Sequence, residues 1–397
     1  MHALALLALA APALLAVSPA VTVRITSPAG GQPAFGVVQV RATVQAVAPI
    51  AEVTFAVDGR VFTHLHRPPF EAATDVGGDN VEHRIEVVAT TTGGATGRAE
   101  LVTPRVATDQ EMKVELRQLY VTVRREGKKV LDLERGDLRV VDDGEEQHTV
   151  TFARGDIPFT AVLLLDSSSS MQGARLQAAV EGVRMFAAAM HPLDEAKLLV
   201  FSERLHHTTP FSGVGELLLA GLGAVNARGG TSVNDNLFLA LSLLDARQGR
   251  RVVVLLSDGA DSHSVLDMPA VMAKVRESQA LVYWIHLEPD GPASAQHALV
   301  SPWHDRAWYR RQIGLLEDGA STTGGKVVGV RRTEEIAPAF AEIVRELREQ
   351  YAIGYYPSGL RHDGRWRKVT VRVSRGLGDK LTHGAYQVLA RGGYVDE

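Results

Sequence analysis

An apolar run that ends in one carboxylate and four hydroxyls constrains this chain more than any other feature. Residues 159–165 are apolar except for one Thr, and Asp166 with four serines follows them directly. The run is too short for a helix and does not alternate, which predicts a parallel strand covered on both faces. Asp166 then lies at the carboxyl end of a strand, where ligands bind in open α/β sheets. The spacing of Asp166, Ser168 and Ser170 places oxygen atoms in a short loop, and Mg²⁺ prefers oxygen ligands.

Two later segments can supply further oxygen ligands for the same ion. Thr231 follows a glycine pair, and Asp258 ends another apolar run before a glycine. Asp166, Ser168, Ser170, Thr231 and Asp258 resemble, in order, the metal-ion-dependent adhesion site of the von Willebrand factor type A domain. The resemblance implies that the three hydroxyls bind the ion, and that the two carboxylates bind it directly or through water.

The resemblance also implies what the site does. We expect Mg²⁺, with Ca²⁺ or Mn²⁺ as alternatives, and a protein partner whose Asp or Glu carboxylate completes the coordination shell. The expected role is adhesion or scaffolding rather than catalysis, since no zinc helix, nucleophile elbow or phosphate loop occurs in the sequence. Three alternatives stay open: the two Asp residues only cap helices, the metal is incidental to a structural scaffold, or the protein is a metal-assisted hydrolase that uses Asp261 or His263. Asp261, Ser262 and Ser264 can equally cap the helix that follows them.

Alternating strands and helices surround this candidate site. Between residues 158 and 350 they predict a doubly wound, mostly parallel sheet, which is the Rossmann-like fold of the von Willebrand factor type A domain. The start of the last helix, near residue 334, stays open because Pro338 would fall inside it. The predicted strands cover residues 196–201, 251–256 and 281–287, and the predicted helices cover 213–225, 234–247, 267–278 and 334–350.

All-β segments flank the α/β segment, so the expected fold class is α/β plus all-β. Residues 21–106 carry several short strands with an Asp58-Gly59 hairpin turn, and they resemble bacterial immunoglobulin-like β-sandwich domains. Residues 108–157 and 351–397 are expected to pair into one discontinuous β-sandwich. Within it, the acidic stretch from Asp142 to Glu145 indicates a hairpin turn rather than a calcium loop.

Motifs in these flanks resemble the exported acidobacterial-type subfamily of von Willebrand factor type A-related proteins. The motifs include Asp143-Gly144, Thr323-Gly324-Gly325, Gln350-Tyr351 and Tyr355-Tyr356-Pro357. The chain departs from that pattern at Gly392-Gly393 before Tyr394, where a charged residue and a single glycine are expected.

The N-terminal segment predicts where the protein is located, and the composition limits its partners. Residues 3–17 are uncharged and apolar and precede Ser18-Pro19-Ala20, so residues 1–20 resemble a secretory signal peptide. We expect export to the periplasm, the medium or the cell surface and no membrane span in the mature chain, an uncleaved anchor being the alternative. The chain has no cysteine, which excludes disulfides and thiolate zinc sites. Lys and Arg number 42 against 46 Asp and Glu, which gives no electrostatic case for nucleic acid. The oligomeric state stays open.

A loop rich in aromatic residues follows the strand at residues 281–287. Residues 288–310 leave that strand toward the candidate metal edge and include Trp303, His304, Trp308 and Tyr309. Aromatic residues are enriched at protein interfaces. We therefore expect this loop to form one wall of the partner site, the alternative being that its aromatics pack on their own domain.

Overall fold

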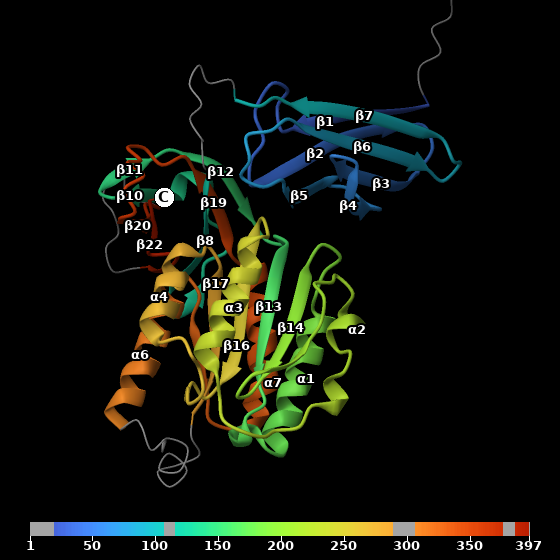
Figure 1. Ribbon diagram of the computed structural model, residues 1–397. Coiled ribbons are helices and arrows are strands. Elements are labelled where there is room, and N and C mark those ends of the chain that lie inside the picture. Colours follow the sequence, from blue (N-terminus) through green and yellow to red (C-terminus); the bar gives the residue numbers. More distant parts are fainter. Residues whose placement is uncertain (1–19, 107–115, 289–305, 376–385, 397) are drawn as a thin grey trace, which may run out of the picture.

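The computed structural model describes residues 20–106, 116–288, 306–375 and 386–396 (Figure 1). Residues 20–106, here the N-terminal β module, form two antiparallel sheets around a core that includes Val53, Phe55 and Ile85. The Asp58-Gly59 turn joins β3 to β4 with both residues at positive φ, 51° and 80°, as an Asp-Gly hairpin predicts. One sheet has the order β1 (Val21–Ser27), β2 (Val37–Ala46), β5 (Glu71–Asp75), and the other has the order β4 (Arg60–Leu65), β3 (Ile50–Val57), β6 (His83–Thr91), β7 (Thr96–Thr103).

Strands from both sides of the α/β segment combine into two further sheets, here the split β module (residues 116–157 and 351–396). One sheet has the order β11 (Glu145–Gln147), β10 (Leu138–Asp142), β20 (Trp366–Val373), β22 (Gly393–Val395). The other has the order β12 (Thr149–Arg154), β19 (Tyr351–Tyr355), β8 (Arg117–Arg125), β21 (Gln387–Leu389), and β9 (Lys128–Lys129) pairs with β8. Asp143 and Gly144 lie at φ 49° and 89° between β10 and β11, so this acidic stretch is a hairpin turn.

A six-stranded sheet forms the centre of the α/β module (residues 158–350). Neighbouring strands from β14 to β18 pair in parallel, and Leu165 of β13 lies opposite both Val200 and Leu256. The short strand β15 pairs antiparallel with β14 at one edge. The strand order is β15 (Leu205–Thr208), β14 (Glu195–Phe201), β13 (Phe159–Asp166), β16 (Arg250–Ser257), β17 (Leu281–Leu287), β18 (Val327–Val330).

Helices cover both faces of this sheet (Figure 1). On one face α1 (Ala174–Ala188) and α7 (Ile336–Arg348) pack in a core that includes Phe186 and Phe340. On the other face α3 (Val233–Asp245), α4 (Met268–Glu277) and α6 (Arg306–Thr322) enclose a second core with Trp284. Apolar side chains of the strands alternate between the two cores, which explains why residues 159–165 form an unbroken apolar run.

Two predicted helices differ from the structure. Residues 213–225 hold only the short helix α2 (Gly215–Leu218) and a 3₁₀ turn at Leu222–Ala224, with Gly221 at φ 79° between them. The last helix begins with a 3₁₀ turn at Thr333–Glu335 and continues as α7. Pro338 lies in the first turn of α7, where a backbone N–H has no partner within the helix, and so it is tolerated.

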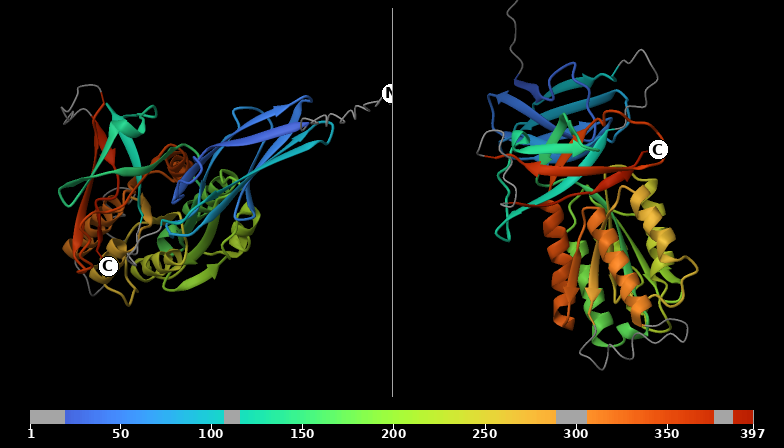
Figure 2. Two further views of the ribbon diagram at one scale, coloured as in Figure 1. Left: turned by 90° about the horizontal axis from the view of Figure 1, so that it is seen from above. Right: turned by 90° about the vertical axis from the view of Figure 1, so that its left-hand side faces the viewer.

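The carboxyl ends of the parallel strands lie at the end of the α/β module that points away from both β modules (Figures 1 and 2). The opposite end of the sheet adjoins those modules: β12 runs directly into β13, α7 runs into β19, and Gln248 donates to Asp79 at 3.0 Å. In the described part of the chain, no helix is both long and apolar enough to cross a membrane.

Candidate metal centre

Asp166 ends β13 and is fully buried. Its Oδ1 accepts a 2.8 Å hydrogen bond from the backbone N–H of Ser168, an Asx-type turn that bends the chain away from the strand. Its Oδ2 accepts a 2.7 Å bond from the Ser257 hydroxyl on the neighbouring strand β16. Both carboxylate oxygens are therefore held in fixed directions, and each keeps a lone pair for another ligand.

Ser168 and Ser170 follow in a tight loop that contains the 3₁₀ turn Ser169–Met171. Their hydroxyl oxygens lie 3.1 Å apart, and the fully buried Met171 anchors the loop to the core. The loop is also bonded to a second loop, since Ser169 N donates to Gly229 O at 3.0 Å and Arg228 N donates to Ser167 O at 2.9 Å. These backbone bonds bring the segment that leads to Thr231 next to the serine loop.

Thr231 is 5% exposed and lies just before α3. Its N–H donates to the Ser262 hydroxyl at 3.0 Å, and its carbonyl accepts from the N–H groups of Ser262 and His263 at 2.9 and 3.0 Å. Residues 262–263 belong to the loop that follows Asp258. The Thr231 loop is thus bonded to the serine loop on one side and to the Asp258 loop on the other.

Asp258 directly follows β16 and is half-buried. Its Oδ1 accepts a 3.0 Å bond from Ala260 N, and Gly259 between them takes φ 75°. The indole of Trp284, on the adjacent strand, supports this turn: its Nε1 donates to Ser257 O at 3.0 Å, and its ring stacks on His286 at 4.1 Å. A Cβ at Gly259 would lie 2.6 Å from the Trp284 ring, so only glycine fits here.

The electrostatics of the two carboxylates favour a bound cation. Burial, with the nearby negative charge of Asp258, raises the pKa of Asp166 to about 7, although the hydrogen bonds from Ser257 and Ser168 lower it. Two anionic groups held this close gain from a positive charge between them. The other side-chain oxygens are neutral hydroxyls, so the donor set is all oxygen and suits a hard divalent cation such as Mg²⁺.

Clusters of histidine and acidic residues are a different kind of metal site. Within the described ranges, no group of three or more His, Cys, Asp or Glu side chains is placed to hold a metal ion. The candidate centre has two carboxylates and takes its remaining side-chain oxygens from Ser and Thr. The residues present therefore fit the adhesion-type donor set that the sequence predicts.

The prediction that Asp261, Ser262 or Ser264 caps the next helix is wrong. Asp267 caps α4, since its side chain accepts from Ala270 N at 2.9 Å. Asp261 instead accepts from Asn234 N at 2.9 Å in the first turn of α3, and from both the N–H and the hydroxyl of Ser264 at 3.1 and 2.5 Å. Its oxygens thus stabilise the loop between the candidate ligands Thr231 and Asp258.

His263, the other hydrolase candidate, is exposed on the same loop. Its Nδ1 lies 2.9 Å from the Ser262 hydroxyl and its Nε2 lies 3.8 Å from the Glu203 carboxylate. The Ser262 hydroxyl also accepts from Thr231 N. Ser262 and His263 therefore help to hold the Thr231 loop.

The aromatic wall is only partly described. Trp303 and His304 lie outside the described residues, whereas Trp308 and Tyr309 belong to α6 and meet edge-to-face at 5.1 Å. Tyr309 is 2% exposed, so it packs on its own domain, and the expectation that it lines a partner site is wrong. Trp308 is half-buried.

Sequence reasoning missed three residues that support the site: Ser257, Trp284 and His286. Ser257 carried a signal, because it is a polar residue at the buried end of an apolar strand. Trp284 and His286 alternate on β17 and so share one face of the sheet, but which strand lies beside β17 cannot be read from spacing.

A comparison with known families agrees with this geometry. Residues 161–260 match the von Willebrand factor type A domain, so this part of the chain is a domain of that class. It contains Asp166, Ser168, Ser170, Thr231 and Asp258. Domains of this class usually mediate protein–protein interaction or adhesion.

Individual proteins are similar to this chain over a short stretch or at low sequence identity. The human (Homo sapiens) inter-alpha-trypsin inhibitor heavy chain H4 is 28% identical over 140 residues, which cover 31% of this chain and 14% of that protein. Among solved structures, a von Willebrand factor type A protein from Catenulispora acidiphila is 11% identical, with 89% of this chain and 74% of that chain covered and a TM-score of 0.39. The vWF domain of the type V pili tip protein Mfa5 from Porphyromonas gingivalis is 14% identical, with coverages of 49% and 96% and a TM-score of 0.37.

Proposed function

We propose that the α/β module binds a protein partner through a divalent cation, Mg²⁺ before Ca²⁺ or Mn²⁺, held by Asp166, Ser168, Ser170, Thr231 and Asp258. The observation that carries the proposal is the buried Asp166 carboxylate, placed close to the negative charge of Asp258 with hydroxyl groups around it. A cation there offsets the repulsion between the two carboxylates.

The chemistry of this donor set implies the kind of partner. Two carboxylates neutralise a divalent charge, and neutral hydroxyls add none, so the ion keeps affinity for one more oxygen ligand. Mg²⁺ usually retains water or ligand oxygens in addition to its protein ligands. A carboxylate from an Asp or Glu of the partner can replace such a water and complete the shell.

The position of the site suits this role. The candidate edge points away from both β modules, so a partner can approach it without contacting them (Figure 1). With the apolar N-terminal segment in the sequence, this supports an exported adhesion or scaffold protein in which the β modules act as spacers.

The first test is calorimetric titration of Mg²⁺ into the full chain and into Asp166→Asn, with Asp363→Asn, remote on the split β module, as the control. We expect saturable binding in the parent and the control and none in Asp166→Asn. Absence of binding by the parent to Mg²⁺, Ca²⁺ and Mn²⁺ would overturn the proposal.

The second test concerns the partner. A short synthetic peptide with one Asp should bind the Mg²⁺-loaded protein and be released by a chelator. Metal binding without any carboxylate binding would favour a scaffold with an incidental metal. Metal-dependent cleavage of ester or peptide substrates that is lost in His263→Ala would instead favour the hydrolase alternative.

A further inference from the structure

Two exposed arginines lie on one side of the candidate metal edge. Arg204 lies in the turn between β14 and β15, where its carbonyl accepts from Ser202 N at 3.0 Å. Arg228 lies in the Thr231 loop, and its N–H donates to Ser167 O at 2.9 Å, one residue from Asp166. Both arginines are therefore carried by the backbone segments that surround the candidate ion.

The side chains of both arginines are exposed. Across the ranges that the structure describes, the guanidinium groups of Arg204 and Arg228 have no ion-pair or hydrogen-bond partner. His206, on β15, contacts the Ser202 hydroxyl, and its pKa is lowered by burial and then by the charges of Arg228 and Arg204. The charge of Glu203 opposes that shift, and its Oε1 accepts from Gly230 N at 3.2 Å and lies 3.8 Å from His263 Nε2.

The opposite side of the edge carries charges of both signs. There α6 begins with Arg306, Arg310 and Arg311, and Glu317 and Asp318 follow further along the helix. Glu288 forms an ion pair with Arg331 at 2.6 Å, whereas Glu317 is exposed on α6. Over β14 and β15 the rim thus presents the exposed guanidinium groups of Arg204 and Arg228, whereas over β17 and α6 it carries charges of both signs.

We propose that the partner segment carries further acidic side chains beside the carboxylate that binds the ion, and that it lies across the β14–β15 side, against Arg204 and Arg228. This inference rests on the proposed function and names its partner class as an acidic peptide segment. Guanidinium groups pair with carboxylates in a forked geometry. Charges at the rim also steer association, so binding should weaken as salt concentration rises.

The test compares two synthetic peptides on the Mg²⁺-loaded full chain. One is acetyl-Gly-Gly-Asp-Gly-Gly-amide, and the other is acetyl-Gly-Glu-Asp-Glu-Gly-amide. We expect the second to bind about five- to tenfold more tightly, as two exposed ion pairs allow. The double variant Arg204→Ala/Arg228→Ala should bind the two peptides with about equal affinity, while its Mg²⁺ affinity, measured by calorimetry, equals that of the parent.

The control is Arg24→Ala/Arg67→Ala, which removes the same charge from exposed positions on the N-terminal β module and should keep the preference. Equal binding of both peptides to the parent would overturn the inference and leave the proposed function intact. A preference that survives in Arg204→Ala/Arg228→Ala would overturn it as well. Binding of neither peptide in the presence of Mg²⁺ would instead overturn the proposed function itself.

Discussion

The hydroxyl of Ser257 donates a 2.7 Å hydrogen bond to Oδ2 of Asp166, and so joins the carboxyl ends of β16 and β13. Ser257 also accepts from Gly259 N at 3.1 Å, which places the bond next to the turn that carries Asp258. One buried side chain thus orients the first candidate carboxylate and the turn of the second.

Replacement of Ser257 by alanine should weaken Mg²⁺ binding about tenfold or more, as is usual for residues that orient metal ligands. The reason is that Asp166 loses a donor that stabilises its charged form, and only the charged form binds metal. Calorimetric titration at pH 7 measures this change.

Ser242→Ala is the matched control, since the Ser242 hydroxyl donates only to a helix carbonyl, Phe238 O. Its Mg²⁺ affinity should equal that of the parent. Equal affinities in Ser257→Ala and Ser242→Ala would show that the bond to Asp166 has no influence on the metal site.

The stability of the metal-free protein should fall as pH rises from about 4 to about 8, through the contribution of Asp166. The folded state raises the pKa of this group from 3.8 to about 7, so between these values the folded chain holds a proton that the unfolded chain has lost. Stability is therefore fully present below pH 3.8 and is lost as pH passes through 7. Thermal unfolding in the presence of a chelator measures the effect.

Asp166→Asn isolates this contribution from other carboxylates. The variant should unfold at a higher temperature than the metal-free parent at pH 8 and at a similar temperature at pH 4. Saturating Mg²⁺ should stabilise the parent at pH 8 and leave the variant unchanged. A parent that is more stable than Asp166→Asn without metal at pH 8 would contradict the raised pKa.

Much of the α/β module could be predicted from local sequence because its strands are buried on both faces. The apolar runs that end at Asp166 and Asp258 are strands β13 and β16, and the helices near residues 234 and 267 are α3 and α4. The turns at Asp58 and Asp143 were also predictable, since an Asp-Gly pair takes positive φ at little cost.

The residues that support the candidate site could not be predicted, because they depend on which segments become neighbours in space. Ser257 reaches Asp166 only because β13 and β16 pair in a register that sets Leu165 opposite Leu256. Asp261 caps α3, which precedes it in sequence, whereas capping patterns predict a helix that follows. The domain class could be predicted from the candidate ligands in the sequence. The residues that support those ligands could be identified only from the folded structure.

Gly259→Ala should be more destabilising than an alanine at another glycine of similar φ. An alanine in the left-handed backbone conformation destabilises the folded state by about 1–2 kcal/mol. A Cβ at 2.6 Å from the Trp284 ring should add about 1–3 kcal/mol through overpacking. Because Asp258 precedes this glycine, Mg²⁺ binding should weaken too. Thermal unfolding and calorimetry measure the two effects.

Gly94→Ala is the control, since Gly94 has φ 82° and no atom within 4 Å of its added Cβ. The double variant Gly259→Ala/Trp284→Phe should recover part of the stability, because the smaller ring leaves space for the methyl group. Equal losses in Gly259→Ala and Gly94→Ala would show that contact with Trp284 is unimportant.

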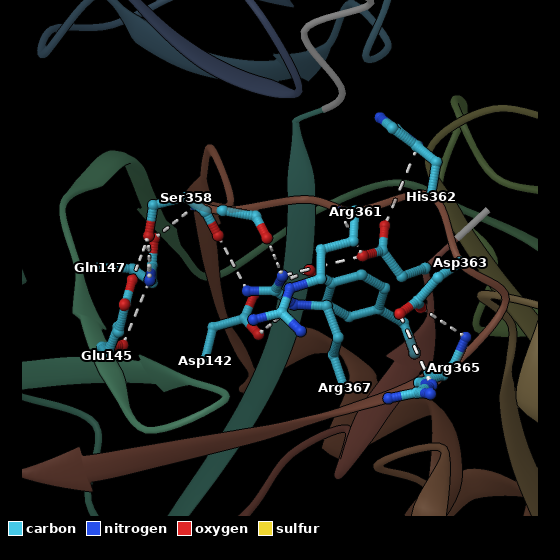
Figure 3. A network of polar contacts seen from close by, with 12 residues as sticks. Asp142, Glu145, Gln147, Ser358, Arg361, His362, Asp363, Arg365 and Arg367 are labelled. Carbon is cyan, nitrogen blue, oxygen red and sulfur yellow. Dashed lines mark hydrogen bonds and ion pairs between the residues drawn. The ribbon is translucent and has the colours of Figure 1, made fainter.

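Asp142 and Arg367 join the two parts of the split β module (Figure 3). Asp142, on β10, is fully buried and accepts from Arg367 Nε at 3.1 Å and from the hydroxyls of Tyr355 and Tyr394 at 3.0 and 2.9 Å. The Arg367 guanidinium also donates to Gly359 O and Ser358 O at 2.8 and 2.9 Å. Asp142 and Arg367 are 225 residues apart in the chain, and the α/β module lies between them in the sequence. The network therefore joins segments on both sides of that module.

Arg367→Met should therefore destabilise the split β module by about 3–5 kcal/mol, because it leaves the Asp142 charge buried without its cation. Hydrogen exchange of the amides in β10 and β20 measures this local stability. Arg365→Met is the control, since the Arg365 side chain is 81% exposed and its Nε lies 3.6 Å from Asp363. It should change the free energy of opening, measured by hydrogen exchange, by less than about 1 kcal/mol. Asp142→Asn/Arg367→Met removes the uncompensated charge and should recover part of the loss. If the double variant exchanged as fast as Arg367→Met, lost packing of the long arginine side chain, rather than the buried charge, would be the cause.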